Sequence, residues 1–278
     1  MRIIINLLIF FTFLGCSEPK KEPQSKIISG DKVVAYTFSE NKKFGLLDSS
    51  LNVILKPKYD YIFDYQDYGV IKTDNGGEQI NGGDYISYET GKIGLIDLRG
   101  NILFGPQFNQ IQISAKSAKV EIDSKYGYVD LKGNFLIKPK FSEAWPEIDG
   151  VAPVKEDSLW GIVKMTGEYL IEPSFLDLSE FNDGIAYFRK NEKGNYGYIN
   201  INGEVLIDGL NGAGTFQYGF GPINKNYKWG IIDSTGEVIV EPQYDESINI
   251  MKREDEIWIM QYDDERKDWK NIKKLKSI

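Results

Sequence analysis

Residues 228–244 read KWGIIDSTGEVIVEPQY. A Trp-Gly pair precedes a short apolar run, an Asp-x-x-Gly segment follows it, and a second apolar run ends at Pro-x-Tyr. Both runs have the length and composition of β-strands, and Asp-x-x-Gly is typical of a tight turn. This stretch therefore predicts an antiparallel β-hairpin.

Five earlier segments of the chain repeat this pattern. The six copies begin at Lys43, Lys92, Lys125, Leu159, Asn195 and Lys228. Consecutive copies start 33 to 36 residues apart, except for the first two, which start 49 residues apart. A nearly fixed period in this range indicates a repeat architecture, in which each unit stacks against its neighbours.

Two positions of the repeat explain the turn. An Asp at its start can accept hydrogen bonds from the turn backbone, and a Gly at its end can adopt the positive φ of a three-residue hairpin loop. The first copy has Leu51 at the glycine position. The predicted structural turn glycines are Gly100, Gly133, Gly167, Gly203 and Gly236.

The residue before the invariant glycine of each hairpin is bulky in every copy. We expect it to pack between neighbouring units and not to serve as a platform for a ligand. The six residues are Phe44, Ile93, Tyr126, Trp160, Tyr196 and Trp229.

A further apolar segment precedes each hairpin, so each unit is expected to contain three short strands. No long stretch carries the apolar period of a helix. We predict an all-β fold, a tandem array of about six three-stranded antiparallel units. An open β-solenoid is favoured because 33 residues are few for a four-stranded propeller blade, and a propeller-like ring is the alternative.

These units resemble WG repeats, a bacterial family in which Lys-Trp-Gly-Tyr-Ile-Asp-x-x-Gly leads into an apolar strand and Pro-x-Phe/Tyr-Asp. Residues 228–245 match this pattern almost position by position, and residues 125–141 match nearly as well. The resemblance covers about residues 33–272. It implies an architecture and a bacterial envelope location. It implies no chemistry, because the function of the family is poorly defined.

The chain ends with a decayed copy of the repeat around Trp258 and Trp269, which we interpret as a cap. We predict that residues 33–278 form the repeat domain, with six full units, this cap and an inserted loop at residues 73–91. The C-terminal lysines indicate a solvated end, and contact with an anionic lipid or polymer is the alternative.

The N-terminus has the features of an export signal. Arg2 is followed by a short apolar run that ends at Gly15-Cys16, and it resembles a bacterial lipoprotein signal, whose cysteine is acylated. Residues 1–16 are therefore the predicted signal peptide, with Cys16 as the lipidation site, and residues 17–32 the predicted flexible tether. The resemblance implies an exported, membrane-anchored lipoprotein, at the outer membrane because Ser17 follows the cysteine; either face of that membrane fits.

Composition excludes several kinds of chemistry. The chain has no histidine and one cysteine, which removes Ser-His-Asp and Cys-His nucleophile systems, His-ligated zinc and internal disulfides. A net charge of −8 argues against nucleic acid as a partner. We expect no cofactor, no metal site and no enzymatic activity. Paired carboxylates could in principle hydrolyse glycosides, but the pattern singles out no pair.

Aromatic residues outside the repeat pattern are the candidates for an exposed binding surface. Several lie in or near the inserted loop, and such insertions often contribute to binding. The loop lacks the Asp-x-Asp-x-Asp-Gly spacing of a calcium loop, and its alternatives are an extended hairpin or a partner contact. The candidates are Tyr65, Tyr68, Tyr85, Tyr88, Trp145, Trp258 and Trp269.

The sequence thus predicts a lipid-anchored, non-catalytic envelope protein. Its repeat surface is expected to bind a protein or another envelope component. A peptidoglycan- or glycan-binding module is one alternative, and a His-free carboxylate hydrolase is another. The sequence leaves the oligomeric state open.

Overall fold

The computed structural model describes residues 21–29, 32–63, 70–75, 92–263 and 268–277. All regular structure in these residues is β-strand, arranged in seven antiparallel sheets. Six sheets have four strands and the last has three. The prediction of an all-β repeat array is therefore confirmed.

The strands of each sheet follow one another in the chain. The first sheet contains β1 (Ser25–Ser29), β2 (Lys32–Glu40), β3 (Lys43–Asp48) and β4 (Val53–Tyr59); the second β5 (Tyr61–Phe63), β6 (Val70–Asn75), β7 (Lys92–Asp97) and β8 (Ile102–Phe108); the third β9 (Gln110–Ile113), β10 (Ser117–Ile122), β11 (Lys125–Asp130) and β12 (Phe135–Phe141); the fourth β13 (Glu143–Ala144), β14 (Val151–Glu156), β15 (Leu159–Lys164) and β16 (Tyr169–Phe175); the fifth β17 (Asp177–Leu178), β18 (Ile185–Asn191), β19 (Gly194–Asn200) and β20 (Val205–Leu210); the sixth β21 (Gly212–Ala213), β22 (Phe220–Lys225), β23 (Lys228–Asp233) and β24 (Val238–Tyr244); and the seventh β25 (Ile248–Arg253), β26 (Glu256–Asp263) and β27 (Asp268–Ser277).

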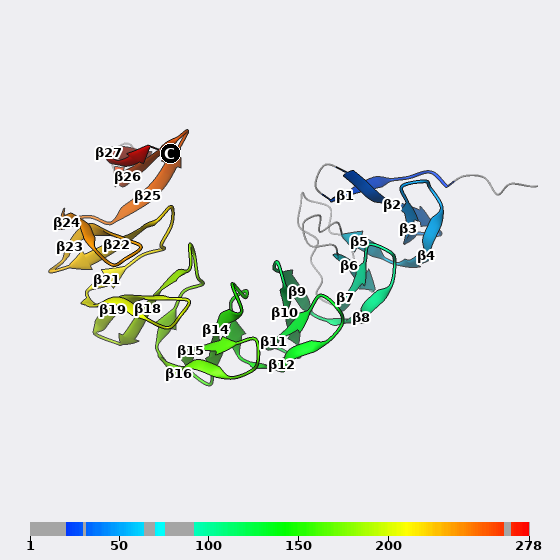
Figure 1. Cartoon of the computed structure of the whole chain (residues 1–278), viewed down its shortest axis with the longest axis horizontal. Coiled ribbons are helices and arrows are strands. Elements are labelled where there is room, and N and C mark those ends of the chain that lie inside the picture. Colours follow the sequence, from blue (N-terminus) through cyan, green and yellow to red (C-terminus); the bar gives the residue numbers. More distant parts are fainter. Residues whose placement is uncertain (1–20, 30–31, 64–69, 76–91, 264–267, 278) are drawn as a thin grey trace, which may run out of the picture.

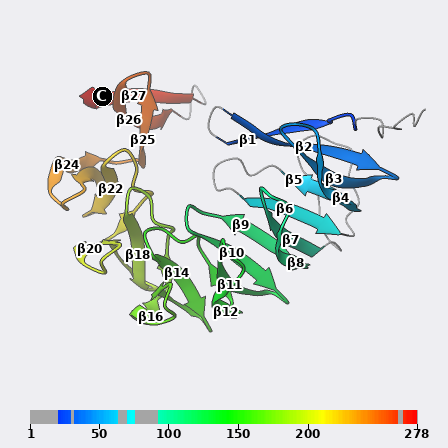
Figure 2. The ribbon, with the colours of Figure 1, turned by 45° about the vertical axis from the view of Figure 1, so that its right-hand side comes forward.

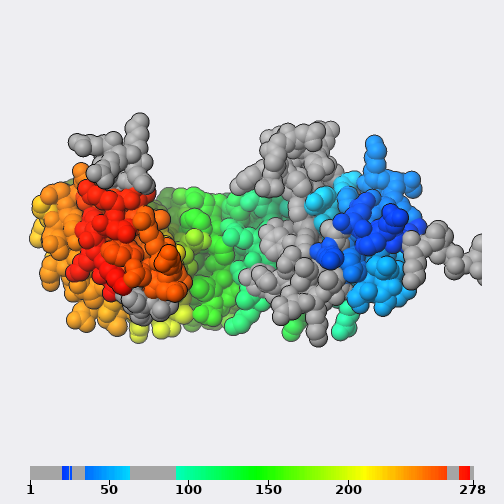
Figure 3. All heavy atoms as spheres, turned by 90° about the horizontal axis from the view of Figure 1, so that it is seen from above, coloured from blue at the N-terminus to red at the C-terminus, as the bar shows by residue number. Residues whose placement is uncertain are grey.

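The seven sheets follow an arc. In the first three sheets, the first strand lies toward the concave side and the fourth toward the convex side, as in the blades of a propeller (Figure 1). The first and last sheets remain apart at the open side of the arc in two views (Figures 1 and 2). Seen from above, they occupy its two ends (Figure 3). The described part of the chain thus combines propeller-like sheets with an open array.

Apolar cores lie between neighbouring sheets. Six clusters of buried side chains each join one sheet to the next along the described part of the chain. Between the fourth and fifth sheets, for example, Trp160 and Ile162 pack with Phe175, Leu178 and Phe188. The prediction that the bulky residue before the glycine packs between units is met at Trp160, which is buried.

Each four-stranded sheet has one strand more than the three that the sequence pattern predicts. The additional strand comes first in chain order, and in the fourth, fifth and sixth sheets it has only two residues. In the fifth sheet it is held by pairing of Asp177 and Leu178 with Arg189 and Phe188. A two-residue strand is too short to show an alternating pattern, so it reads as a loop in the sequence.

The hairpin turns form as their residues require. Asp233 Oδ1 accepts hydrogen bonds from the amides of Thr235 and Glu237 at 2.9 and 3.0 Å, and its carbonyl accepts from Gly236. Gly236 has φ +88°, a conformation that costs glycine little. At the same position of the first sheet, Leu51 adopts φ +67°.

The invariant glycine of each hairpin lies opposite a bulge. In the fourth sheet, Trp160 pairs with Phe175 but Ile162 pairs with Ile171, so extra residues around Pro173 bulge out of β16. The bulge brings the Ile171 carbonyl so close to Gly161 that an added Cβ would lie 2.6 Å from it. Only glycine fits there.

The seventh sheet departs from this arrangement. Trp258 pairs with Met251, and this pair corresponds to the pair of Gly161 with Val154 in the fourth sheet. Trp258 therefore occupies the position of the invariant glycine. Its partner strand β27 contains no proline. Ile257 pairs with Lys276 and Trp258 pairs with Lys274, so β27 has one extra residue beside Trp258, whereas β16 has two extra residues around Pro173.

Candidate interaction site

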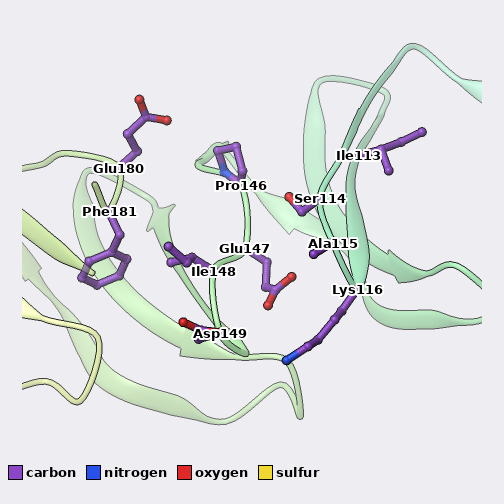
Figure 4. Close-up of a pocket in the computed structure, with 10 residues that line it drawn as sticks. All are labelled: Ile113, Ser114, Ala115, Lys116, Pro146, Glu147, Ile148, Asp149, Glu180 and Phe181. Carbon is purple, nitrogen blue, oxygen red and sulfur yellow. The ribbon is translucent and has the colours of Figure 1, made fainter. Parts of the chain in front are cut away.

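A pocket of 320 Å³ lies where loops from three consecutive sheets meet (Figure 4). In the third, fourth and fifth sheets, these loops connect the first strand to the second. The pocket is lined by Ile113, Ser114, Ala115, Lys116, Pro146, Glu147, Ile148, Asp149, Glu180 and Phe181.

The loop between the first two strands of the fourth sheet ends in a tight turn. Asp149 and Gly150 have φ +48° and +89°, and Ile148 and Val151 exchange both backbone hydrogen bonds across them. Two consecutive residues at positive φ form the type I′ turn that matches the twist of a hairpin, and Asp-Gly is a favoured sequence for it. This turn fixes the segment that carries Glu147.

Glu147 is the central polar group of the pocket. Its side chain is buried, with 7% of the residue surface exposed. Oε2 accepts a hydrogen bond from the Ser117 hydroxyl at 2.8 Å, and Oε1 accepts one from the Gly150 amide at 2.7 Å. The carboxylate therefore links the third sheet to the turn of the fourth. Figure 4 shows it pointing toward the Lys116 side of the pocket.

Glu147 breaks the repeat pattern. Counting from the turn residues Asp149, Asp183 and Tyr218, the position of Glu147 is occupied in the next two repeats by Phe181 and Phe216. Both phenylalanines are buried in cores between sheets. A carboxylate in place of a core aromatic is costly to bury unless it is hydrogen-bonded, and repeat-breaking residues of this kind often mark functional sites.

Two further polar side chains lie close to this pocket. Tyr128 is fully buried and donates a hydrogen bond to the Trp145 carbonyl at 2.6 Å; burial, and then the charge of Glu147, raise the pKa of Tyr128. Lys119 donates to the Ala144 carbonyl at 3.0 Å. Burial lowers the pKa of Lys119, while the charges of Glu180 and Glu121 oppose the shift.

This arrangement suits a ligand that offers hydrogen-bond donors. Glu147 is held by two donors, and each of its oxygens retains a lone pair. Asp149 and Glu180 add exposed carboxylates, while Ile113, Ile148 and Phe181 provide apolar walls. A polar or cationic group with an aliphatic stem fits such a pocket.

The predicted binding residues that the structure describes do not line this pocket. Tyr65, Tyr68, Tyr85 and Tyr88 lie outside the described residues, as do Cys16 and most of the inserted loop. Trp145 is half-buried, stacks on Trp160 with ring centroids 6.1 Å apart, and donates its indole N–H to the Leu178 carbonyl. It thus belongs to the interface between the fourth and fifth sheets and not to an exposed aromatic surface.

Trp258 and Trp269 lie in the last sheet, far along the arc from Trp145. Ile257 and Ile259 face the sixth sheet, so alternation places Trp258 on the opposite face. The register of β27 places Trp269 on that same face. Both are half-buried, and the Trp258 indole N–H donates to Glu256 Oε2 at 3.0 Å.

Glu147, Ser117 and Lys119 are not among the residues that the repeat pattern singles out. A signal for Glu147 is nevertheless present, because aligning the loops shows a charge where two other repeats have phenylalanine. Ser117 and Lys119 become notable only when the neighbouring sheet is in place.

Within the described ranges, no group of three or more Asp, Glu, His or Cys side chains is arranged to hold a metal ion. The same residues include no helix long and apolar enough to cross a membrane.

The sheets and the shared hairpin define a repeat β-protein. The family described as WG containing repeat matches residues 44–77, 126–160, 160–193, 196–229 and 229–249, more than half of the chain. The chain therefore belongs to the WG containing repeat family. The second hairpin, in which Ile93 replaces the aromatic residue, falls outside these matches.

Similarity to individual known proteins is low in sequence. No curated protein matches the chain. Among solved structures, Kluyveromyces lactis Hsv2 shares 9% identity and a TM-score of 0.42, over 87% of this chain and 95% of that one. PorZ, described as an essential bacterial surface component of the type-IX secretion system of Porphyromonas gingivalis, shares 11% identity and a TM-score of 0.32, over 87% of this chain and 36% of its own.

Proposed function

We propose that this protein is a lipid-anchored, non-catalytic scaffold of the bacterial cell envelope, which holds a protein partner at the Glu147 pocket. The observation that carries the proposal is the buried carboxylate of Glu147, at a position where two other repeats have phenylalanine. A lysine or arginine side chain of the partner would place its stem against Phe181 and Ile148 and its charge toward Glu147.

The anchor part of the proposal rests on the N-terminal sequence. Gly15-Cys16 at the end of a short apolar run supports acylation of Cys16, and Ser17 supports sorting to the outer membrane. Cys16→Ser is expected to move the protein from the membrane fraction to the soluble fraction of the envelope. Unchanged fractionation would contradict the anchor and leave the pocket proposal intact.

The pocket part is tested by site-specific photocrosslinking in intact cells. A photoreactive amino acid at Lys116, which lines the pocket, is expected to give a protein adduct of defined mass. The same amino acid at Lys138, exposed on the convex strand β12, serves as the control. Equal adducts at both positions, or none at Lys116, would contradict a partner at the pocket.

A cell-wall glycan is the second candidate ligand, because Trp258 and Trp269 share one face of the last sheet. Co-sedimentation of the full chain with purified sacculi tests it. Binding that is lost in Trp258→Ala and kept in Glu147→Gln would favour the glycan over a protein partner.

A further inference from the structure

The fourth strands of the six four-stranded sheets differ in charge between the two halves of the array. Each of these strands lies at an edge of its sheet. In the first three sheets, the fourth strand and the residue before it contain four lysines and no carboxylate in all; these segments are residues 52–59, 101–108 and 134–141. In the next three sheets they contain six carboxylates and no basic residue; these segments are residues 168–175, 204–210 and 237–244.

The charge changes at equivalent positions of the repeat. The residue before the bulge proline, or before Gly209 in the fifth sheet, is in chain order Lys56, Gly105, Lys138, Glu172, Asp208 and Glu241. The residue after the turn is in chain order Asn52, Asn101, Asn134, Glu168, Glu204 and Glu237. All twelve residues are exposed, so the hairpin itself requires neither charge at these positions.

The four lysines, Lys56, Lys58, Lys138 and Lys140, form what we call the basic edge. All four are exposed, and among the described residues no carboxylate lies within ion-pairing distance of them. The Lys58 and Lys140 ammonium groups lie 4.9 and 4.8 Å from the ring centroids of Tyr59 and Phe141. The charges of the basic edge are therefore available to a partner.

The basic edge lies on the convex side of the array and close to the predicted anchor (Figure 1). β1 begins nine residues after Cys16, a length that spans up to roughly 30 Å when extended. β1 and β4 are the two edges of one four-stranded sheet, about 15 Å apart. A lipid on Cys16 would therefore hold the basic edge within reach of a bilayer.

We propose that the basic edge docks on the anionic surface of the membrane that holds the lipid anchor, an inference that rests on the proposed acylation of Cys16. A lipid anchor is strengthened by a second, polybasic signal, and each lysine near an anionic surface strengthens binding about fivefold. A flat bilayer meets the convex edge at the second sheet, where β8 is uncharged, with a lysine pair on each side. Attraction extends over a Debye length of about 8 Å, which brings both pairs into play.

The distance of the basic edge from the bilayer can be compared with that of the acidic half on the anchored chain. The acylated full-length protein carries a donor fluorophore on Gln107→Cys or Gln243→Cys, and the vesicles contain a lipid labelled with an acceptor. Both glutamines are exposed, and each directly follows the bulge proline, in the second and sixth sheets. The pair therefore compares the two halves of the array at one repeat position.

We expect energy transfer from position 107 to be at least about twice that from position 243 on vesicles of phosphatidylcholine and phosphatidylglycerol. The difference should shrink on pure phosphatidylcholine, and in about 1 M salt, where the Debye length is about 3 Å. Equal transfer from the two positions on the anionic vesicles would overturn the proposal, as would the same difference on neutral vesicles.

Charge reversal tests the lysines themselves. Glutamate at all four positions of the basic edge should lower the transfer from position 107 to its level on neutral vesicles, and glutamine should lower it partly. The control variant has the same net charge and reverses four other exposed residues, Lys193, Lys225, Lys252 and Arg253. All eight positions are exposed, so both variants should unfold near the wild-type temperature. An equal loss of transfer in the control would contradict a docking edge.

The labelling also separates the basic edge from the anchor. Acylated Cys16 has no free thiol, so an anchored chain carries one dye and a chain without the lipid carries two. Two dyes would contradict the anchor, and the basic edge would then require that the chain float with anionic vesicles and be released by salt. Flotation that salt leaves unchanged would overturn it. A photoreactive amino acid at Gln107 that gives a protein adduct in intact cells would also contradict it, because the occupant would then be an acidic protein.

Discussion

Gly161 lies against the carbonyl oxygen of Ile171, so close that a Cβ would be 2.6 Å from it. The same contact recurs in four other hairpins, where the glycine meets the carbonyl of the residue ten positions later in the chain; these glycines are Gly45, Gly127, Gly197 and Gly230. Proline follows that carbonyl residue by two positions in four of the five hairpins, where it has no N–H to donate to a ladder. The glycine and the proline of the repeat are therefore two halves of one bulge.

Gly161→Ala should be among the most destabilising substitutions that add one methyl group to this protein. Its backbone has an ordinary φ, so the cost comes from collision with the backbone at Ile171 and Pro173. We expect a loss of about 3 kcal/mol in the free energy of unfolding, as for overpacking at a rigid site. Urea denaturation measures it, and Gly105→Ala, with no atom within 4 Å of the added Cβ, is the control.

The turn glycines should fall into two classes. Gly167 has φ +92° with nothing within 4 Å of an added Cβ, so Gly167→Ala should cost about 1 kcal/mol from backbone strain alone. Gly133 has φ +101° and also approaches the preceding sheet at Leu103, so Gly133→Ala should cost more. Thermal unfolding of both variants tests this order, and equal costs would contradict the role of Gly133 in sheet contact.

The repeat pattern makes the hairpins and the stacking predictable because their causes are local. The Asp233 and Gly236 turn chemistry, the alternation of each strand and the fixed period are all visible in one copy compared with the next. The two-residue strand Asp177–Leu178 is not predictable in this way, because it depends on pairing with Arg189 in the following strand. The need for glycine at position 161 is hidden for the same reason, since the carbonyl that it meets belongs to another strand.

The candidate site is less predictable than the fold. Exposure of Trp145 is expected from its place outside the repeat pattern, but it packs on Trp160, which belongs to that pattern. Glu147 can be recognised as a candidate only by comparing the loops of different repeats, because two other repeats have phenylalanine at the equivalent position. Its partner Ser117 comes from the neighbouring sheet, a contact between residues 30 positions apart that no short motif encodes.

The turn aspartates should make stability depend on acid pH. Hydrogen bonds from Thr235, set against a small effect of burial, lower the pKa of Asp233 below its ordinary value of 3.8. The pKa values of Asp48, Asp97 and Asp130 are also lowered in the folded chain. Because the pKa of these aspartates is lowered in the folded state, they stabilise the fold above about pH 4. This stabilisation is lost as the pH falls through their pKa in the folded state.

Asparagine at these four positions should remove that dependence. Asn200 occupies the same place in the fifth hairpin, and its Oδ1 accepts from the amides of Asn202 and Glu204 at 3.0 Å. The quadruple Asp→Asn variant should therefore unfold near the wild-type temperature at about pH 7 and lose less stability between about pH 5 and pH 2.5. An identical acid profile for the two proteins would contradict the role of the aspartates.

Ser117→Ala should destabilise the fold through Glu147. The change removes one of the two donors to a buried carboxylate, and the unmet hydrogen bond should cost about 1 to 3 kcal/mol. The loss should shrink when Glu147 is already Gln, since a neutral amide is less costly to leave partly unpaired. A double-mutant cycle in urea measures this coupling, and strictly additive effects would contradict the contact.

Glu147→Phe separates the stability of the pocket from its proposed function. Phenylalanine occupies the equivalent positions 181 and 216, where both side chains are buried in cores between sheets. Replacing a buried charge with an apolar side chain is often neutral or stabilising, so the unfolding temperature should stay the same or rise. Crosslinking from Lys116 to a partner should nevertheless be lost. If Glu147 served the fold alone, the Glu147→Phe variant would keep its crosslinks. If a partner recognises the carboxylate, the variant will be stable but will no longer crosslink.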